Sequence, residues 1–187
     1  MKSFRSTLLL LLLLSVSLSV LGQKSDGTDG TIFVGHNFSF ALKEPAGWVM
    51  DSELAKSQGL QAVLYPTGSS WQKSVVVMYA RVINKDEKQA TIEKVISDDI
   101  DDFLRLSKES TVGDSPSLET RDKKKGISKV FYDAANKNYE YVTFIDEPKV
   151  VVIIALSSRD KNEYEKSLPA FKALVSSYFL FTPLVAP

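Results

Sequence analysis

Alternating apolar and polar residues predict β-structure along most of the chain beyond its N-terminal part. Within the segment 37–42, Phe38, Phe40 and Leu42 alternate with smaller residues, so their side chains share one face of a half-buried strand. The run 150–156 is almost wholly apolar, which predicts a central strand covered on both faces. The same reasoning predicts strands over residues 48–50, 60–65, 74–83, 117–123, 126–134, 138–146 and 149–157.

Two longer segments have the residue spacing of helices. Over residues 90–106, apolar residues recur every three or four positions, which predicts an amphipathic helix lying on a core. A final helix is predicted over 159–179, with Pro169 at the start of a second helical segment, because proline is tolerated best in a first turn. A brief helix that ends at Gly59 is also predicted.

The connections between the later strands predict their direction. Residues 113–116 are predicted to be a polar connection, and the turns at 124–126, 135–138 and 147–149 are short. Short turns join antiparallel neighbours, because a parallel crossover needs a dozen or more residues. The order of strands, helix, strands and helix therefore predicts an α+β fold, an antiparallel sheet packed by helices as an α/β/α-type sandwich.

The N-terminal segment has the layout of a secretory signal peptide. Lys2 and Arg5 precede a run of leucines, and small residues follow up to Gly22. We therefore predict that residues 1–22 are a signal peptide cleaved before Gln23, and that the protein is secreted or periplasmic. The apolar run is shorter than the roughly 20 residues that a membrane-spanning helix needs, so no membrane span is expected after cleavage.

The mature chain is predicted to contain one domain. Residues 23–31 are polar and glycine-rich and predict a flexible tether, and a single α+β domain is expected over 32–182. The chain has no cysteine, so its core must be held by packing alone, without thiol catalysis or thiolate metal sites. Its 23 basic and 23 acidic residues supply no concentrated positive charge, which argues against nucleic acid as a partner.

Two segments resemble a known group of proteins. Residues 38–51 (FSFALKEPAGWVMD) and 168–179 (LPAFKALVSSYF) are similar to the PsbP and DcrB-related superfamily. Its antiparallel sheet packed by helices is also seen in Ran-binding Mog-type proteins. The resemblance implies a small non-catalytic accessory or binding protein, of a kind often exported in bacteria, and it supplies no catalytic motif.

Two groups of polar residues are candidates for a catalytic or metal site. His36 is the only histidine, and no Gly-x-Ser-x-Gly turn is present to supply a nucleophile beside it, so it is interpreted as a turn residue. The acidic residues at 98–102 lack the glycine-containing loop of a calcium hand, and a helix would point them in different directions. We predict no catalytic residue, no metal site and no cofactor.

Four aromatic residues are the candidates for a binding surface. Trp48, Tyr65, Trp71 and Tyr79 lie in or beside the first predicted strands, where exposed rings contribute strongly to recognition. Core packing is the more common fate of such rings. Trp71 is the clearest exception, because it lies in the polar loop 68–72.

The sequence therefore favours an exported, non-catalytic binding or accessory protein, whose partner is a protein or a small ligand. Two alternatives remain open at this point: a hydrolytic enzyme whose site includes His36, and an envelope stress or assembly factor.

Overall fold

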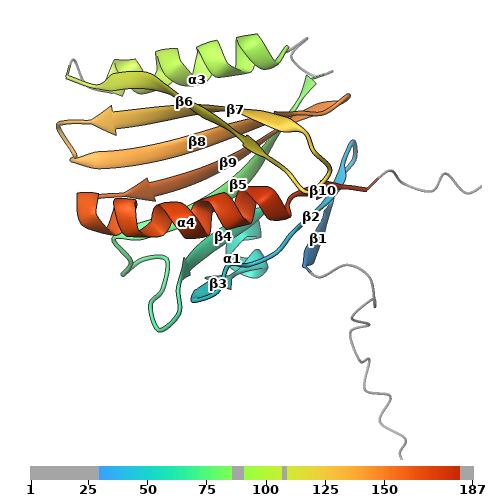
Figure 1. Cartoon of the computed structure of the whole chain (residues 1–187), viewed down its shortest axis with the longest axis horizontal. Coiled ribbons are helices and arrows are strands. Elements are labelled where there is room, and N and C mark those ends of the chain that lie inside the picture. The colour runs from blue at the N-terminus through green and yellow to red at the C-terminus, as the bar shows by residue number, and fades with distance from the viewer. Residues whose placement is uncertain (1–29, 86–90, 107–108, 182–187) are drawn as a thin grey trace, which may run out of the picture.

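The computed structural model describes residues 30–85, 91–106 and 109–181, and its main feature is a seven-stranded sheet (Figure 1). Every neighbouring pair of strands is antiparallel, in the order β3-β4-β5-β9-β8-β7-β6. The strands are β3 (Trp48–Met50), β4 (Ala62–Pro66), β5 (Val76–Asn84), β6 (Thr111–Glu119), β7 (Lys125–Asp133), β8 (Asn138–Asp146) and β9 (Val150–Ser158).

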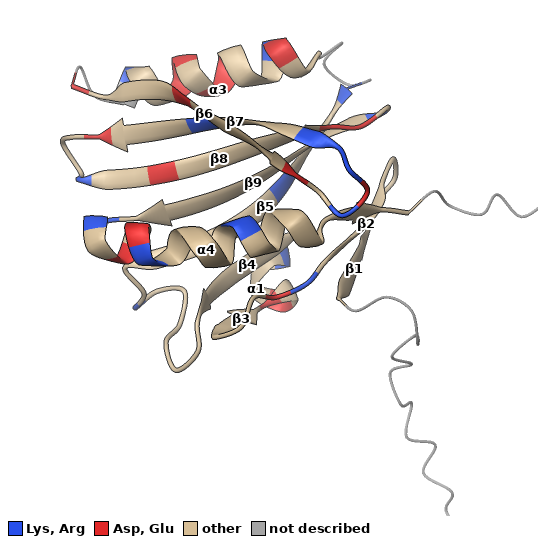
Figure 2. Ribbon diagram, in the orientation of Figure 1, with Lys and Arg blue, Asp and Glu red and all other residues tan. Residues whose placement is uncertain are grey.

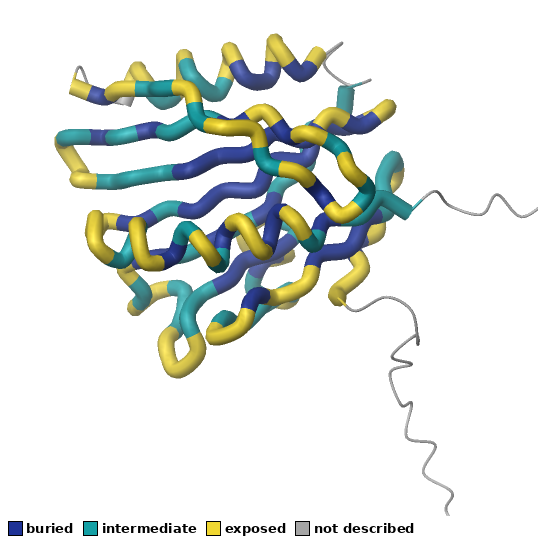
Figure 3. The backbone as a smooth tube through the Cα atoms, in the orientation of Figure 1, coloured by how far each residue is buried: buried dark blue, intermediate teal, exposed yellow. Residues whose placement is uncertain are grey.

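The two long helices, α3 (Ile92–Leu106) and α4 (Lys161–Ser177), cover opposite faces of this sheet (Figure 1). The side chains of β9 alternate between the faces: Val152 and Ile154 join the core beneath α4, and Ile153 and Ala155 join the core beneath α3. The central strands β8 and β9 are consequently the most continuously buried part of the chain (Figure 3).

A second, three-stranded sheet closes one end of the α4 side. It consists of β1 (Thr31–Val34), β2 (Ser39–Leu42) and β10 (Phe179–Leu180), with β2 in the middle. Phe40 is fully buried and packs its ring against that of Tyr178, with 5.3 Å between the ring centroids. The short helix α1 (Ser52–Ser57) lies beside β4 and begins after the cap residue Asp51.

The observed architecture confirms the predicted fold class, an α+β fold with an antiparallel sheet packed by helices. The helix predicted over 90–106 is α3, and the hairpin strands over 126–134 and 138–146 are β7 and β8. The expectation of a second helical segment at Pro169 was wrong, because α4 runs through this residue without a break.

The other differences lie at the sheet edges. The connection predicted at 113–116 is part of β6, an edge strand that tolerates Pro116 because a register shift between Ser115 and Leu118 leaves that stretch outside the ladder. Thr31, placed in the tether by the sequence, begins β1. The helix predicted to reach residue 179 ends at 177, and the chain then forms β10.

The predicted signal peptide, its cleavage site at Gly22 and Gln23, and residues 23–29 of the tether lie outside the described residues. Over residues 30–85, 91–106 and 109–181, no helix is both long enough and apolar enough to cross a bilayer.

Candidate functional site

Two of the four aromatic candidates help to hold the domain together. Trp48 is half-buried in β3 and packs against the core beneath α4. Tyr65 lies on β4, pointing to the opposite face, and its hydroxyl donates a hydrogen bond to Asp51 Oδ2 at 3.2 Å. Because Asp51 also caps α1 through the Leu54 N–H, Tyr65 fastens this helix to the sheet. Partial burial and the Asp51 carboxylate raise the pKa of Tyr65.

The other two candidates line adjoining cavities on the α3 face of the sheet. Trp71 lines a first cavity of about 370 Å³, and Tyr79 lines a second of about 280 Å³. Asp133 and Asn138 line both, so the two cavities adjoin, and we call them together the polar groove. The first cavity is also lined by Val75, Val77, Asn136, Ser157, Ser158 and Arg159, and the second by Asp99, Asp102, Phe103, Phe131 and Glu140.

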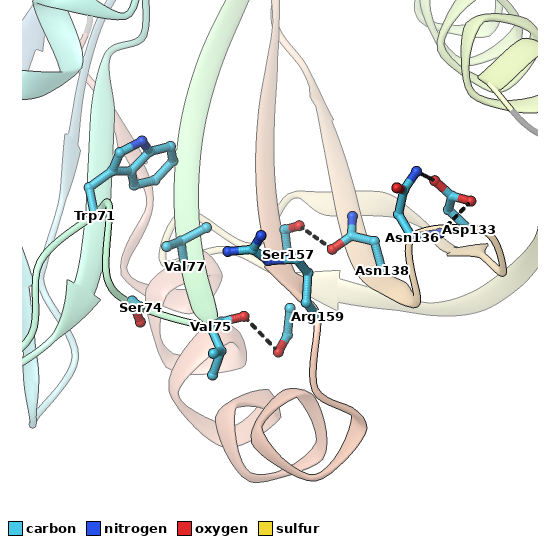
Figure 4. A pocket seen from close by; sticks show the side chains of 10 residues that line it. Trp71, Ser74, Val75, Val77, Asp133, Asn136, Asn138, Ser157 and Arg159 are labelled. Carbon is cyan, nitrogen blue, oxygen red and sulfur yellow. Dashed lines mark hydrogen bonds between the residues drawn. The ribbon is translucent and has the colours of Figure 1, made fainter.

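Figure 4 shows how distant segments meet at the first cavity. Trp71 approaches from the β4–β5 connection, and Asp133 and Asn136 approach from the β7–β8 turn on the other side. Val77 on β5 and Ser157 on β9 form the floor between them, as cross-strand partners. The groove is therefore built by the register of the sheet rather than by any contiguous motif.

The polar groove begins where two neighbouring strands, β8 and β9, change from apolar to polar residues at the same level. On β8, Val142 is followed on the same face by Glu140, and on β9, Ala155 is followed by Ser157. The register pairs Val142 with Ala155 and Glu140 with Ser157, so the two changes coincide. On β7 the change, from Phe131 to Asp133, comes one cross-strand pair further along, because Phe131 pairs with Glu140 and Asp133 with Asn138.

Hydrogen bonds link the polar side chains of these strands. Asn138 Nδ2 donates to Glu140 Oε1 at 2.7 Å, and Ser157 Oγ lies 2.9 Å from the same oxygen. Ser157 Oγ also lies 3.1 Å from Asn138 Oδ1, so its one proton is shared between two acceptors. Among the described residues, neither Glu140 Oε2 nor the Tyr79 hydroxyl has a hydrogen-bond partner, and both residues line the second cavity.

The surroundings of Glu140 oppose its ionisation. Burial raises the pKa of its carboxyl, and the nearby charge of Asp99 adds to this effect. The hydrogen bonds from Ser157 and Asn138, together with the charge of Arg81, act in the opposite direction without cancelling the rise. Burial also raises the pKa of Tyr79, and the Glu140 carboxylate raises it further.

Asp133 has a structural role that Glu140 lacks. Its Oδ1 accepts hydrogen bonds from the backbone N–H groups of Ala135 at 3.0 Å and Asn136 at 3.3 Å, and Oδ2 accepts one from Asn136 Nδ2 at 2.6 Å. These bonds lower the pKa of Asp133 and shape the β7–β8 turn. Asp133 is therefore saturated by the protein itself, whereas Glu140 retains a free oxygen.

Three of the five acidic residues of α3 form ion pairs with basic side chains. Red segments recur along α3 in Figure 2. Asp98 pairs with Lys94, Asp99 with Arg81 on β5, and Asp102 with Arg105. Among residues 30–85, 91–106 and 109–181, no three histidine, aspartate or glutamate side chains are placed to hold a metal ion.

His36 lies far from this chemistry. It is exposed in the turn between β1 and β2, on the three-stranded sheet, and it lines neither cavity of the polar groove. The structure therefore does not bring His36 together with the other polar residues considered for catalysis.

Solved structures supply the comparison that the sequence alone does not. No protein-family model matches the chain, and no curated protein matches it. The solution structure of cyanobacterial PsbP from Synechocystis is similar over 86% of this chain and 99% of that one, with 12% identity and a TM-score of 0.52. The chain has a PsbP-like fold.

Two bacterial structures are also similar to this PsbP-like chain. One is from Bacteroides thetaiotaomicron, with 9% identity, 83% of this chain and 50% of that chain covered, and a TM-score of 0.41. The other is a protein of unknown function from Pseudomonas aeruginosa, with 8% identity, coverage of 83% and 98%, and a TM-score of 0.42. At these identities the similarity concerns the fold alone.

Sequence reasoning identified Trp71 and Tyr79 on the PsbP-like sheet but missed the polar residues between them. These polar residues lie on strands or at strand ends whose sequences are typical of any strand with one polar face: Asn138, Glu140, Ser157 and Arg159. One signal was present: on β8 the apolar face ends at Val142, whereas the strand continues to Asn138. The polar residues form a groove only because the register of β8 with β7 and β9 places them side by side.

Proposed function

We propose that the protein is an exported, non-catalytic binding protein whose ligand occupies the polar groove. The observation that carries the proposal is the pair of adjoining cavities on the α3 face, where Glu140 Oε2 and the Tyr79 hydroxyl have no hydrogen-bond partner among the described residues. Small-molecule sites are concave and a few hundred Å³ or more in volume, and their polar groups fix the orientation of the ligand; the polar groove has that volume and is rich in such groups. Export follows from the predicted signal peptide over residues 1–22.

Energetics supports a functional origin for Glu140. A buried carboxylate without a cationic partner costs free energy, and an apolar residue would suit the sheet face better. Val142, the next residue on the same face of β8, is apolar and belongs to the core beneath α3. Groups that destabilise a fold and have perturbed pKa values concentrate at functional sites.

A role as an accessory subunit, the second outcome foreseen from the sequence, uses the same groove with a side chain of a protein partner in place of a small molecule. A hydrolytic enzyme based on His36 is less well supported, because the exposed position of this residue leaves it outside the groove.

Native mass spectrometry of the protein purified gently from its own host tests the proposal. We expect an added small mass on the wild-type chain and its loss in the variant Val75→Trp. Val75 is 47% exposed and lines the first cavity, so a larger side chain there fills the groove without entering the core.

Ile127→Trp is the matched control for that variant. Ile127 is an exposed apolar residue of β7, 38% accessible, that lines neither cavity, so this variant retains the ligand. Retention of the added mass by Val75→Trp would contradict the proposal. A co-purifying polypeptide that Val75→Trp releases would instead identify an accessory subunit.

A further inference from the structure

The charges that line the polar groove are not balanced at the Glu140 end. Four carboxylates line the second cavity, and two of them, Asp99 and Asp102, form ion pairs with arginines. Asp133 and Glu140 form no ion pair with any described residue. Both oxygens of Asp133 already accept hydrogen bonds from the β7–β8 turn, so Glu140 Oε2 is the oxygen of these two carboxylates that is free to contact a ligand.

The sheet leaves room above this carboxylate. Tyr79 on β5 and Glu140 on β8 are separated by β9, whose residues on this face, Ala155 and Ser157, have short side chains. Neighbouring strands are about 4.8 Å apart, and Tyr79 pairs with Ala155 whereas Glu140 pairs with Ser157, so the two longer side chains lie diagonally across β9. Both line the same cavity, where Glu140 Oε2 is free to accept a hydrogen bond and the Tyr79 hydroxyl is free to make one.

Aromatic rings complete the walls of this cavity. Phe103 on α3 and Phe131 on β7 line the second cavity and contact each other edge to face, with centroids 5.0 Å apart. A cation near aromatic faces is attracted by the ring quadrupole, most strongly where water is excluded. Carboxylate, hydroxyl and rings together therefore favour the same kind of ligand group.

Other charged ligands fit this end poorly. An anion would meet the uncompensated charge of Glu140, and a hard metal ion needs more oxygen ligands than the described side chains bring together. The first cavity differs, because Arg159 lines it and forms no ion pair with a described residue. The two ends of the groove thus differ in charge.

We infer that the ligand of the polar groove carries an organic cation, an ammonium or a guanidinium group, which binds between Glu140 Oε2 and the Tyr79 hydroxyl. The inference rests on the proposed function, since it names the chemistry of the ligand for the same groove. The bound cation supplies the positively charged partner that Glu140 lacks among the described residues.

A matched pair of probes tests how much the positive charge of the ligand contributes to binding. N-acetyl-L-arginine amide carries a guanidinium group, and N-acetyl-L-citrulline amide has nearly the same shape without the charge. We expect titration of the isotope-labelled mature protein, followed by amide chemical shifts, to perturb residues of the second cavity. The arginine derivative should bind at least about tenfold more tightly than the citrulline derivative.

Two variants assign the preference to Glu140. Glu140→Gln should abolish the preference for the arginine derivative, with amide shifts outside the groove unchanged as proof of folding. Asp101→Asn removes the same charge from an exposed position of α3 outside the groove and should retain it. Equal binding of the two probes, no shifts in the groove, or a preference that survives Glu140→Gln would overturn the inference.

The fate of the natural ligand separates failure of the inference from failure of the proposed function. A neutral or anionic ligand that Val75→Trp releases would overturn the inference and leave the proposed function standing. Retention of the natural ligand by Val75→Trp, together with equal binding of the two probes to the wild-type protein, would overturn both.

Discussion

The two faces of the seven-stranded sheet are built by the same strands but have different compositions. The α4 face is mostly apolar and is closed by α4 and the three-stranded sheet, with Phe171, Leu174 and Tyr178 fully buried. The α3 face is apolar only beneath α3, and beyond it Glu140 and Ser157 stand in an open groove. We interpret the first face as the source of stability and the second as the region available for binding.

The largest difference between the faces should appear on deletion of a ring. Phe171 on α4 is fully buried against Tyr141, so Phe171→Ala should lower the free energy of unfolding by about 3–5 kcal/mol. Phe103→Ala on α3 removes a half-buried ring and should cost about 1–2 kcal/mol. Urea unfolding measures both, with Phe171→Leu as a milder variant at the same position. Equal losses would show that the two faces contribute equally.

A second difference concerns ion pairs. On the α4 side, Glu147 is 1% exposed, pairs with Lys124 and accepts a hydrogen bond from the Tyr178 hydroxyl at 3.0 Å. Lys124→Met leaves this carboxylate buried without a cation and should cost about 2 kcal/mol, less than for a fully buried pair because Lys124 is partly exposed.

Lys129→Met is the counterpart on the α3 face, where Lys129 of β7 pairs with Asp114, whose side chain is 88% exposed. We expect a change of no more than about 0.5 kcal/mol, because exposed pairs contribute little. Thermal unfolding of both variants measures the difference. Similar losses would contradict the interpretation that only the α4 side depends on a buried charge pair.

The contrast between the faces was only partly predictable from the sequence. The helix α3 and the strands β8 and β9 were predicted because their apolar spacing is regular over many residues. The edge strand β6 was predicted over 117–123 and overlaps that range only at 117–119, because Gly113 and Pro116 are typical of turns and an exposed edge imposes no apolar alternation. The small strands β1 and β10 are too short to show a pattern.

The polar groove was less predictable than the fold. Asp133, Glu140 and Ser157 lie on three strands, and a shift of one residue in register would point them to different faces. A single sequence does not specify that register. Trp71 was identified because a large apolar ring in a polar loop needs a local reason, and here the ring borders a cavity. Tyr65 was a plausible candidate by type, and it instead fastens α1 to the sheet.

A third prediction compares the two tryptophans. Trp71 packs against neither core and only borders the groove, so Trp71→Ala should lower the free energy of unfolding by about 1 kcal/mol. Trp48→Ala, which removes a ring from the core beneath α4, should cost about twice as much. Chemical unfolding measures the stabilities, and native mass spectrometry measures retention of the ligand. A larger loss for Trp71→Ala would show that Trp71 is a core residue and would remove it from the binding site.

The smallest expected change in the free energy of unfolding has the opposite sign. Glu140→Gln should stabilise the domain at neutral pH by about 0.5–1 kcal/mol. The charged and titratable groups that face Glu140 from the surrounding elements are Tyr79 and Arg81 on β5, Asp99 and Asp102 on α3, and Asp133 on β7. Burial and Asp99 raise the pKa of Glu140 above its ordinary value of 4.5.

The raised pKa fixes the pH dependence of this effect. The folded state binds the proton of Glu140 more tightly than the unfolded state, so wild-type stability falls as the pH rises from 4.5 through the raised pKa. The variant lacks this loss, so its advantage should be smallest below pH 4.5 and full at neutral pH. Unfolding in urea across this range measures it. A destabilised variant at pH 7 would mean that Glu140 supports the fold, as Glu147 does, and that the α3 face has the same structural role as the α4 face.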